Sequence, residues 1–370
     1  MIYLDYAADT PADERVIEEF CLCQREFYAN PNSTHPSGTV AAKKLFDSIE
    51  RIKNFFESAN EYEFIPVASA SEANNLAIKG IAESYRENGR HIISTYLEHA
   101  SVGGALTYLQ NKGYEVELAD IKRDGKIDTE SLRALMRKDT ILVSVCAADS
   151  ELGTLQPIRE IIKIVSEYPS CRVHTDAAQA VGKIPAAFFC GADCFSFAAH
   201  KFYGLNGAAF LARRKGVILS PLIHGGGSVS LYRSGTPPLA LIASAAKAVE
   251  LAYENLRERF EYVSKLNAYV RNCLIGIRGI KINSPADASP YILNISVEGK
   301  KGEQTKDFLG EHGICVSVKS ACSVKNTPSK AVLVVTGERK RALSSIRISL
   351  SHLTDKKEAD ELIDTLKGYV

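Results

Sequence analysis

The 370-residue chain lacks several features that would assign it to a familiar class of protein. It has no apolar stretch long enough to cross a membrane, and no basic segment followed by an apolar run opens it, so we expect a cytoplasmic protein without a membrane partner. It also has no excess of one charge, because 45 lysines and arginines face 44 aspartates and glutamates. No net field favours direct binding to nucleic acid, and small-molecule chemistry is the better expectation.

The common nucleotide and metal signatures are absent as well. There is no GxxxxGK[ST] loop and no GxGxxG fingerprint after a strand, which argues against a nucleotide-dependent enzyme. The nine cysteines are scattered and odd in number, and the closest pair, Cys21 and Cys23, has the wrong separation for a CxxC redox or zinc motif. We therefore expect a reduced compartment and name no metal ligand.

What the chain does contain is an alternation of short apolar runs and amphipathic segments. Runs typical of buried strands alternate with helical periodicity as far as about residue 212. This order predicts an α/β fold with a mostly parallel sheet and helices on both faces. A proline-free helical stretch over 239–275 suits a helix that links two domains. We place the boundary at residue 255, which gives a large domain over 1–255 and a smaller α+β domain over 256–370.

A group of polar side chains follows predicted strands at the points where the strands end. These residues are Ser71, His99, Ser150, Asp176 and Lys201. Because ligands bind at the carboxyl ends of parallel strands, we expect these residues to share a site. A lysine beside a buried strand loses solvation, and desolvation favours the neutral amine that forms Schiff bases with aldehydes. Two alternatives stay open: a solvated Lys201 just past its strand, and a Ser71 that only caps its own helix.

The C-terminal part adds two candidates. Arg347 alternates with Ile346 and Ile348 along a predicted strand, which places it on the face opposite to those apolar residues. Cys322 lies among small and polar residues in a predicted exposed loop, where a thiol is accessible to reagents. An incidental surface thiol is the alternative interpretation of Cys322.

In their order and spacing, segments along almost the whole chain resemble the cysteine desulfurases. These are pyridoxal-phosphate enzymes of the class V aminotransferase group, fold type I. The segments that carry the resemblance are Tyr3-Leu4-Asp5-Tyr6-Ala7-Ala8, Asn30-Pro31-Asn32-Ser33 with His35, Ser71-Glu72-Ala73-Asn74-Asn75, Glu98-His99, His174-Thr175-Asp176-Ala177-Ala178-Gln179, His200-Lys201, Gly225-Gly226-Gly227 with Arg233-Ser234-Gly235-Thr236, Ser320-Ala321-Cys322-Ser323, and Ser345-Ile346-Arg347.

The resemblance implies the fold type I architecture. A mostly parallel sheet of the seven-stranded type would form the large, cofactor-binding domain, and the smaller α+β domain would carry the nucleophile loop and the arginine that binds the substrate carboxylate. The first ~12 residues are expected to pack on the smaller domain. The resemblance also implies a homodimer.

A role in binding pyridoxal 5′-phosphate is implied for each matching residue. Lys201 is similar to the lysine that forms the Schiff base and moves protons, and Asp176 to the aspartate that keeps the pyridine nitrogen protonated. His99 is similar to the histidine that stacks on the ring and handles the proton of the substrate thiol. The other implied contacts are Gln179 to the phenolic oxygen, Ser150 to cofactor and substrate, Ser71 and His200 to the phosphate, and Thr236 to the phosphate across the dimer interface.

The implied reaction converts L-cysteine to L-alanine. Arg347 is similar to the residue that binds the substrate carboxylate, a task suited to the guanidinium fork, and Asn32 is a further expected substrate contact. Cys322 is similar to the nucleophile that takes the sulfur as a persulfide. The loop that starts at Cys322 has the longer form of the branch that serves iron–sulfur cluster assembly and tRNA thiolation. The expected partner is therefore a sulfur-acceptor protein, either a scaffold or a tRNA-thiolation enzyme.

The chain departs from the family pattern at three places near this site. Ala198 stands where the family usually has a serine on the phosphate, and Ser150 stands where it has an asparagine. Residues 228–231 read Ser-Val-Ser-Leu instead of polar-Glu-Arg-Gly. These departures leave two alternatives open: a related lyase or aminotransferase that acts on another amino acid, such as selenocysteine or cysteine sulfinate, and a partner with impaired turnover in a sulfur-transfer complex.

Overall fold

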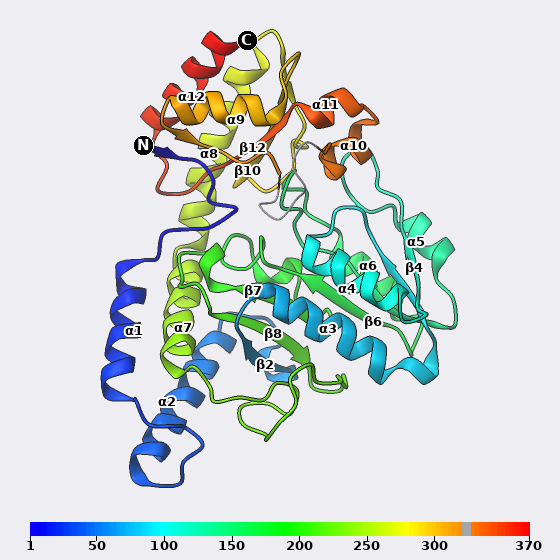
Figure 1. Cartoon of the computed structure of the whole chain (residues 1–370), viewed down its shortest axis with the longest axis vertical. Helices are drawn as coiled ribbons and strands as arrows, with labels where there is room; N and C mark the ends of the chain where they lie inside the picture. The colour runs from blue at the N-terminus through cyan, green and yellow to red at the C-terminus, as the bar shows by residue number, and fades with distance from the viewer. Residues whose placement is uncertain (320–326) are drawn as a thin grey trace.

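The computed structural model describes residues 1–319 and 327–370, and its centre is a seven-stranded sheet (Figure 1). The strand order is β2-β8-β7-β6-β5-β3-β4, and β8 runs antiparallel to both of its neighbours, while the pairs from β7 to β4 are parallel. The strands are β2 (Tyr62–Val67), β3 (His91–Ser94), β4 (Glu115–Leu118), β5 (Thr140–Ser144), β6 (Arg172–Asp176), β7 (Cys194–Ala198) and β8 (Ala209–Arg214). The predicted mostly parallel α/β fold is confirmed.

The central strands are buried on both faces because they carry apolar side chains on both sides of the sheet. In β7, Phe195 and Phe197 enter the core on one side of the sheet, and Cys194 and Ala198 enter the core on the other. The ring of Phe56 lies 5.4 Å from that of Phe195 and 5.5 Å from that of Phe197, between ring centroids. This aromatic packing fixes the end of β7, from which the chain continues to Lys201.

Helices cover both faces of the sheet. α3 and α4 pack against one face, and α2, α6 and α7 pack against the other. The helices of this part are α1 (Glu14–Glu26), α2 (Pro36–Lys53), α3 (Ala70–Ser84), α4 (Ala100–Gln110), α5 (Thr129–Leu135), α6 (Ile158–Val165) and α7 (Leu239–Glu254). Short 3₁₀ helices occupy Ala59–Glu61, Arg86–Asn88, Ala186–Phe188 and Ala199–Lys201. No helix in residues 1–319 and 327–370 is long and apolar enough to cross a membrane.

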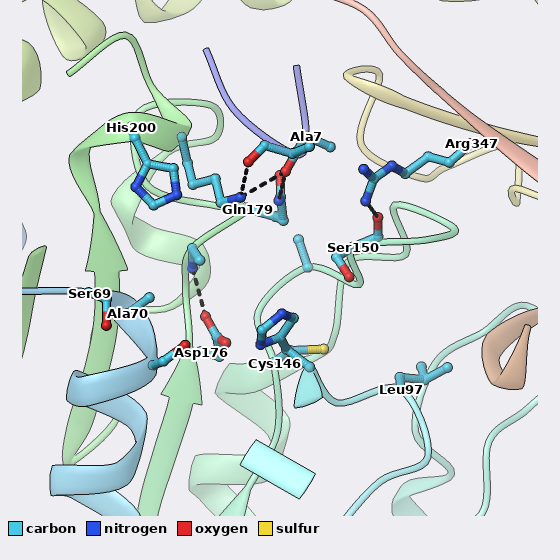
Figure 2. Close-up of a pocket in the computed structure, with 16 residues that line it drawn as sticks. Ala7, Ser69, Ala70, Leu97, Cys146, Ser150, Asp176, Gln179, His200 and Arg347 are labelled. Carbon is cyan, nitrogen blue, oxygen red and sulfur yellow. Dashed lines mark hydrogen bonds between the residues drawn. The ribbon is translucent and has the colours of Figure 1, made fainter. Parts of the chain in front are cut away.

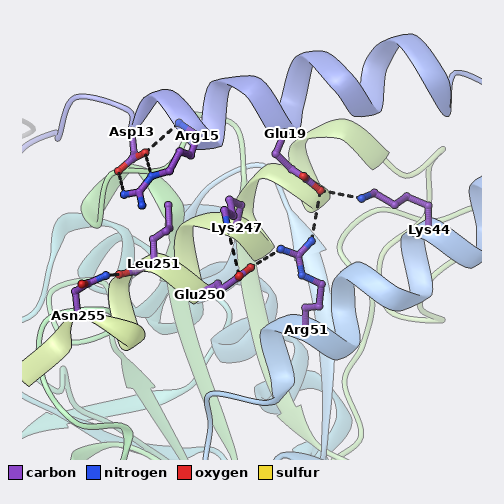
Figure 3. A network of polar contacts seen from close by, with 9 residues as sticks. All are labelled: Asp13, Arg15, Glu19, Lys44, Arg51, Lys247, Glu250, Leu251 and Asn255. Carbon is purple, nitrogen blue, oxygen red and sulfur yellow. Dashed lines mark hydrogen bonds and ion pairs between the residues drawn. The ribbon is translucent and has the colours of Figure 1, made fainter.

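An ion-pair network joins α1, α2 and α7 (Figure 3). Glu19 of α1 lies 2.8 Å from Lys44 and 3.4 Å from Arg51, both on α2. Arg51 also pairs with Glu250 of α7, which Lys247 approaches at 3.3 Å. Because these side chains are partly exposed, each pair contributes about 1 kcal/mol or less. The network therefore fixes how the three helices align, and the apolar core supplies most of their stability.

The C-terminal part has its own sheet and its own core. β12, β10 and β9 form an antiparallel sheet in that order, and α8, α9 and α12 contribute to the apolar cluster beside it. The elements are α8 (Leu256–Ile275), β9 (Ile280–Ile282), β10 (Ile292–Val297), α9 (Gly302–Glu311), β11 (Ile314–Cys315), α10 (Lys330–Thr336), α11 (Arg339–Leu343), β12 (Ser345–Ser349) and α12 (Lys356–Tyr369). The division of the chain at residue 255 stays a prediction.

The first residues of the chain lie beside this C-terminal part (Figure 1). β1 (Ile2–Tyr3) pairs in parallel with β11, and the side chains of Ile2 and Leu4 are buried in the C-terminal core. The chain then crosses to the larger part, where the backbone N–H of Thr10 donates to the carbonyl of His200 at 3.0 Å. The segment after β1 therefore bridges the two cores and contacts the turn that follows β7.

The helical stretch over 239–275 is two helices rather than one. α7 ends at Glu254 and α8 begins at Leu256, because Asn255 adopts φ −106° and ψ 11°. Its side-chain amide donates to the carbonyl of Leu251 at 3.0 Å, a local bond of the kind that lets asparagine compete with helix geometry. The prediction of one continuous helix was wrong at this residue.

Candidate active site

A cavity of about 270 Å³ lies where the strand ends of the large sheet face the N-terminal segment and β12 (Figure 2). Its volume is close to the lower end of the range for small-molecule sites. The residues predicted from the sequence that line it are Ser71, His99, Ser150, Asp176, Gln179, His200, Lys201 and Arg347. The strand-end residues therefore lie around one cavity, as the sequence predicts.

Asp176 is the last residue of β6, and its carboxylate is held at both oxygens. Oδ1 accepts a hydrogen bond from the backbone N–H of Ala178 at 3.0 Å, and Oδ2 accepts one from Nδ2 of Asn74 at 2.8 Å. Asn74 is itself fully buried, and its Oδ1 accepts from the hydroxyl of Ser196. The cavity therefore contains a carboxylate whose position is fixed by its own sheet and by α3.

Lys201 closes the 3₁₀ turn after β7 and reaches into the same cavity. Its Nζ donates to the carbonyls of Ala7 at 3.1 Å and Ala8 at 2.5 Å, so it is not a freely solvated ammonium. Burial, and next the nearby guanidinium of Arg347, lower the pKa of Lys201. Burial and the charge of Lys201 also lower the pKa of His200 to about 4, so its ring is neutral at physiological pH. A lysine in this setting is suited to act as a nucleophilic amine.

Gln179 is oriented by contacts at both ends of its side-chain amide. Its Nε2 donates to the carbonyl of Ala7 at 2.8 Å, and its Oε1 accepts from Nζ of Lys183 at 2.7 Å. Lys183 is 5% exposed, and burial, followed by the charges of Lys201 and Arg347, lowers its pKa to about 7. The carbonyl of Ala7 is thus shared by Gln179 and Lys201.

Ser71 and His99 stand at the starts of two helices. The N-cap of α3 is Ser69, whose Oγ accepts from the backbone N–H of Glu72 at 3.1 Å. Ser71 lies in the first turn instead, so the alternative that it only caps its own helix was wrong. His99 is the N-cap of α4, and its Nδ1 accepts from the backbone N–H of Ser101 at 3.2 Å.

Arg347 enters the cavity from β12 and is 2% exposed. One terminal nitrogen donates to Oδ1 of Asp5 at 2.8 Å, and the other donates to the carbonyl of Ser150 at 3.0 Å. Its Nε is buried without a hydrogen-bond partner among the described residues. The guanidinium therefore lines the cavity with donor capacity left over, which is the condition for binding an anion.

Two described residues that were predicted for the site, Asn32 and Thr236, do not line this cavity. Oδ1 of Asn32 accepts from the hydroxyl of Ser228 at 2.9 Å, beside a different hollow of the surface. Thr236, which was expected to reach a partner subunit, does not line the cavity of its own chain among the described residues. Cys322 lies outside the described residues.

The departures from the family pattern occupy distinct positions. Ala198 ends β7 and is fully buried. Its methyl side chain has no hydroxyl to offer to a phosphate. In the segment that follows the triple glycine, Leu231 is 81% exposed, and Arg233 pairs with Glu72 of α3 at 3.0 Å. The first turn of α3 is therefore tied to this segment by an ion pair.

Some residues of the cavity, and some that bind its side chains from behind, were not found from the sequence. The carbonyls of Ala7 and Ala8 carry no signal, because any residue has a carbonyl. Asn74 and Lys183 are three residues after Ser71 and four residues after Gln179, so helical spacing could have indicated them. Cys146 lines the cavity as well, and burial raises the pKa of its thiol.

Comparisons with known proteins show which family the chain belongs to. The family model described as "Aminotransferase class-V" matches residues 2–362. The "NifS/IcsS protein homolog" of Lactobacillus delbrueckii subsp. bulgaricus is 36% identical over 98% of this chain and 95% of its own length. The "Cysteine desulfurase IscS" of Dictyoglomus turgidum is 35% identical over 100% of this chain and 94% of its own. A solved structure named "NIFS-LIKE PROTEIN" superposes with a TM-score of 0.91 at 34% identity, covering 100% of this chain and 98% of the other. The chain therefore belongs to the class V aminotransferase family and, within it, to the cysteine desulfurases.

Proposed function

We propose that this protein is a pyridoxal-phosphate-dependent cysteine desulfurase that converts L-cysteine to L-alanine and transfers the sulfur to Cys322. One observation carries the proposal. The cavity brings together a lysine with a lowered pKa, a fixed carboxylate and an arginine with donor capacity left over, which are Lys201, Asp176 and Arg347. Family membership supports the same chemistry.

The residues present fit the cofactor. Asp176 would hold the pyridine nitrogen, because its carboxylate is fixed and charged, and Nε2 of Gln179 is oriented to donate to a phenolic oxygen. The phosphate would lie at the first turn of α3, where Ser71 supplies a hydroxyl and the helix N-terminus supplies N–H groups and a positive dipole end. His200 would be a further contact to the phosphate. When bound, the cofactor supplies an electron sink that makes the substrate Cα acidic.

The substrate would be held and deprotonated by the chain's own residues. Arg347 would bind the carboxylate through its free donor positions, and Ser150 lies beside it with its side chain at the cavity. Burial lowers the pKa of Lys201, which favours its neutral amine, so Lys201 would move the proton at Cα. His99 would face the substrate sulfur.

Cys322 would receive the sulfur. Its thiolate forms a bond to the sulfur of the substrate while the C–S bond breaks. The electron pair of that bond stays with carbon, which takes a proton and leaves as alanine. We further propose that the persulfide serves iron–sulfur cluster assembly or tRNA thiolation in the cytoplasm, with a scaffold or thiolation enzyme as the acceptor. The partner subunit of a homodimer would supply Thr236 to the phosphate, and Asn32 would contact the substrate.

The test is the stoichiometry of products. The protein, loaded with pyridoxal phosphate, is incubated with L-cysteine and a thiol reductant, and alanine and sulfide are measured. We expect both products in equal amounts, with activity lost in Lys201→Ala and in Cys322→Ala. Bound cofactor with neither product would contradict the proposal. A wild-type protein that turns over selenocysteine but not cysteine, and that keeps this turnover in Cys322→Ala, would favour a lyase for another amino acid.

A further inference from the structure

A chain of hydrogen bonds runs from Asp176 to His99. Nδ2 of Asn74 donates both of its protons, one to Oδ2 of Asp176 at 2.8 Å and one to Oγ of Ser101 at 2.9 Å. Its Oδ1 accepts from Ser196. A carboxylate can only accept hydrogen bonds, so the NH₂ group of Asn74 has to face Asp176, and the orientation of the amide is settled by chemistry.

The donor and acceptor roles of Ser101 follow from this orientation. Its hydroxyl accepts from Asn74, and its single proton is left for the remaining neighbour, Nδ1 of His99 at 2.9 Å. The backbone N–H of Ser101 faces the same nitrogen at 3.2 Å. With two donors directed at it, Nδ1 holds a lone pair, and the proton of the neutral ring is on Nε2.

The other ring nitrogen is directed elsewhere. In the part of the chain that the structure describes, Nε2 of His99 makes no hydrogen bond, and the ring lines the cavity. We infer that Ser101 is a positioning residue that fixes His99 as the Nε2–H tautomer, so that the ring presents a hydrogen-bond donor to the cavity. This inference rests on the proposed function for its consequence. His99 stabilises the substrate sulfur as an anion by donating to it, and proton removal falls to another group such as Lys201.

The effect of the Ser101 hydroxyl on His99 can be tested separately from the capping of α4. Capping of α4 uses the backbone N–H of Ser101 and the ring of His99, and it needs no hydroxyl. Ser101→Ala therefore keeps the backbone N–H that the cap uses and removes one of the two donors that face Nδ1, while Ser101→Thr keeps a hydroxyl. Ser166→Ala is the matched control, because its hydroxyl donates only to the nearby carbonyl of Lys163, at 2.7 Å.

The direct test is ¹⁵N NMR of the histidine ring nitrogens in the full-length protein, with and without pyridoxal phosphate. His99→Gln identifies the signal by its loss. In the wild type and in Ser101→Thr we expect an unprotonated Nδ1 and a protonated Nε2, and in Ser101→Ala we expect a mixture of both tautomers. A protonated Nδ1 in the wild type, or the same tautomer in Ser101→Ala, would overturn the inference.

Steady-state kinetics give a second readout. Loss of one neutral hydrogen bond predicts a kcat about fivefold lower in Ser101→Ala with little change in KM, recovery in Ser101→Thr and no effect in Ser166→Ala. An unchanged kcat in Ser101→Ala would contradict the role in catalysis. The failures are distinguishable. Turnover of cysteine with a protonated Nδ1 sinks this inference alone, whereas the expected tautomer without turnover sinks the proposed function and leaves the tautomer assignment standing.

Discussion

Two charged residues, Asp176 and Arg347, reach the cavity from different sides and are held in opposite ways (Figure 2). Both oxygens of Asp176 accept hydrogen bonds, one from the turn that follows β6 and one from α3. Arg347 depends on Asp5, which comes from the N-terminal segment, and its Nε has no partner among the described residues. Asp176 is thus a carboxylate held in a fixed position, whereas Arg347 is placed to exchange one anionic partner for another.

The largest effect is expected from replacing the fixed carboxylate. Asp176→Asn keeps the shape of the side chain but leaves a neutral amide where a cofactor nitrogen would need a carboxylate. We expect kcat for desulfuration to fall about a hundredfold to a thousandfold, in line with the loss of a preorganised charge at a reacting group. Asp287→Asn, in an exposed pair with Lys126, is the control and should be silent. Activity above half of the wild type in Asp176→Asn would contradict the role of Asp176.

Replacing the exchangeable residue should affect binding more than turnover. In Arg347→Lys the single ammonium cannot hold Asp5, the carbonyl of Ser150 and a substrate carboxylate together. We therefore expect KM for L-cysteine to rise about tenfold to a hundredfold while kcat changes little. Arg341→Lys, which alters an arginine bound to Asn283 outside the cavity, serves as the control. A normal KM in Arg347→Lys would mean that the carboxylate binds elsewhere.

The contrast sharpens if the internal partner of Arg347 is neutralised. Asp5→Asn keeps an acceptor for Arg347 and a partner for Ser317, but removes the negative charge that competes with the substrate. We expect KM for L-cysteine to fall about fivefold, as for the loss of one competing hydrogen-bonded contact. A higher KM would show instead that Asp5 holds Arg347 in its binding position.

The last prediction concerns stability rather than activity, and it comes from Lys183 behind Gln179. Burial lowers the pKa of Lys183 to about 7, below that of an unfolded lysine. Between about pH 7 and about pH 10 the unfolded chain binds a proton here that the folded chain does not, so this residue makes the free energy of unfolding rise with pH. Urea unfolding across this range should show a weaker rise in Lys183→Met, and the same rise as the wild type in Lys138→Met, an exposed control. Parallel curves for Lys183→Met and the wild type would contradict the buried, neutral state.

The sequence predicted which strand-end residues line the cavity, but not the contacts that the N-terminal segment makes there. Ser71, His99, Ser150, Asp176 and Lys201 follow strands, and the geometry of a parallel sheet brings strand ends to one edge, so the pattern alone placed them together. The contacts that escaped prediction are those of the Ala7 and Ala8 carbonyls with Lys201 and Gln179, and the ion pair between Asp5 and Arg347. These contacts join residues far apart in the chain without any periodicity, and backbone carbonyls have no signature in a sequence.

The break at Asn255 escaped prediction for a different reason. Helical periodicity continues through 239–275 and no proline interrupts it, so the pattern favours one helix. A side-chain bond to the carbonyl of Leu251 and packing of the two helices on different cores decide the conformation of this residue. Tertiary packing of this kind is not encoded in a local pattern.

Trapping the cofactor on the chain with borohydride and locating it by peptide mass spectrometry is the most direct test. Two lysines with lowered pKa lie close together, but only Lys201 of this pair lines the cavity, beside Asp176 and Arg347. Reduction should therefore place pyridoxal phosphate on Lys201, with no label in Lys201→Ala. A label on Lys183, or no label on a protein that binds the cofactor, would contradict the assignment of this cavity as the active site.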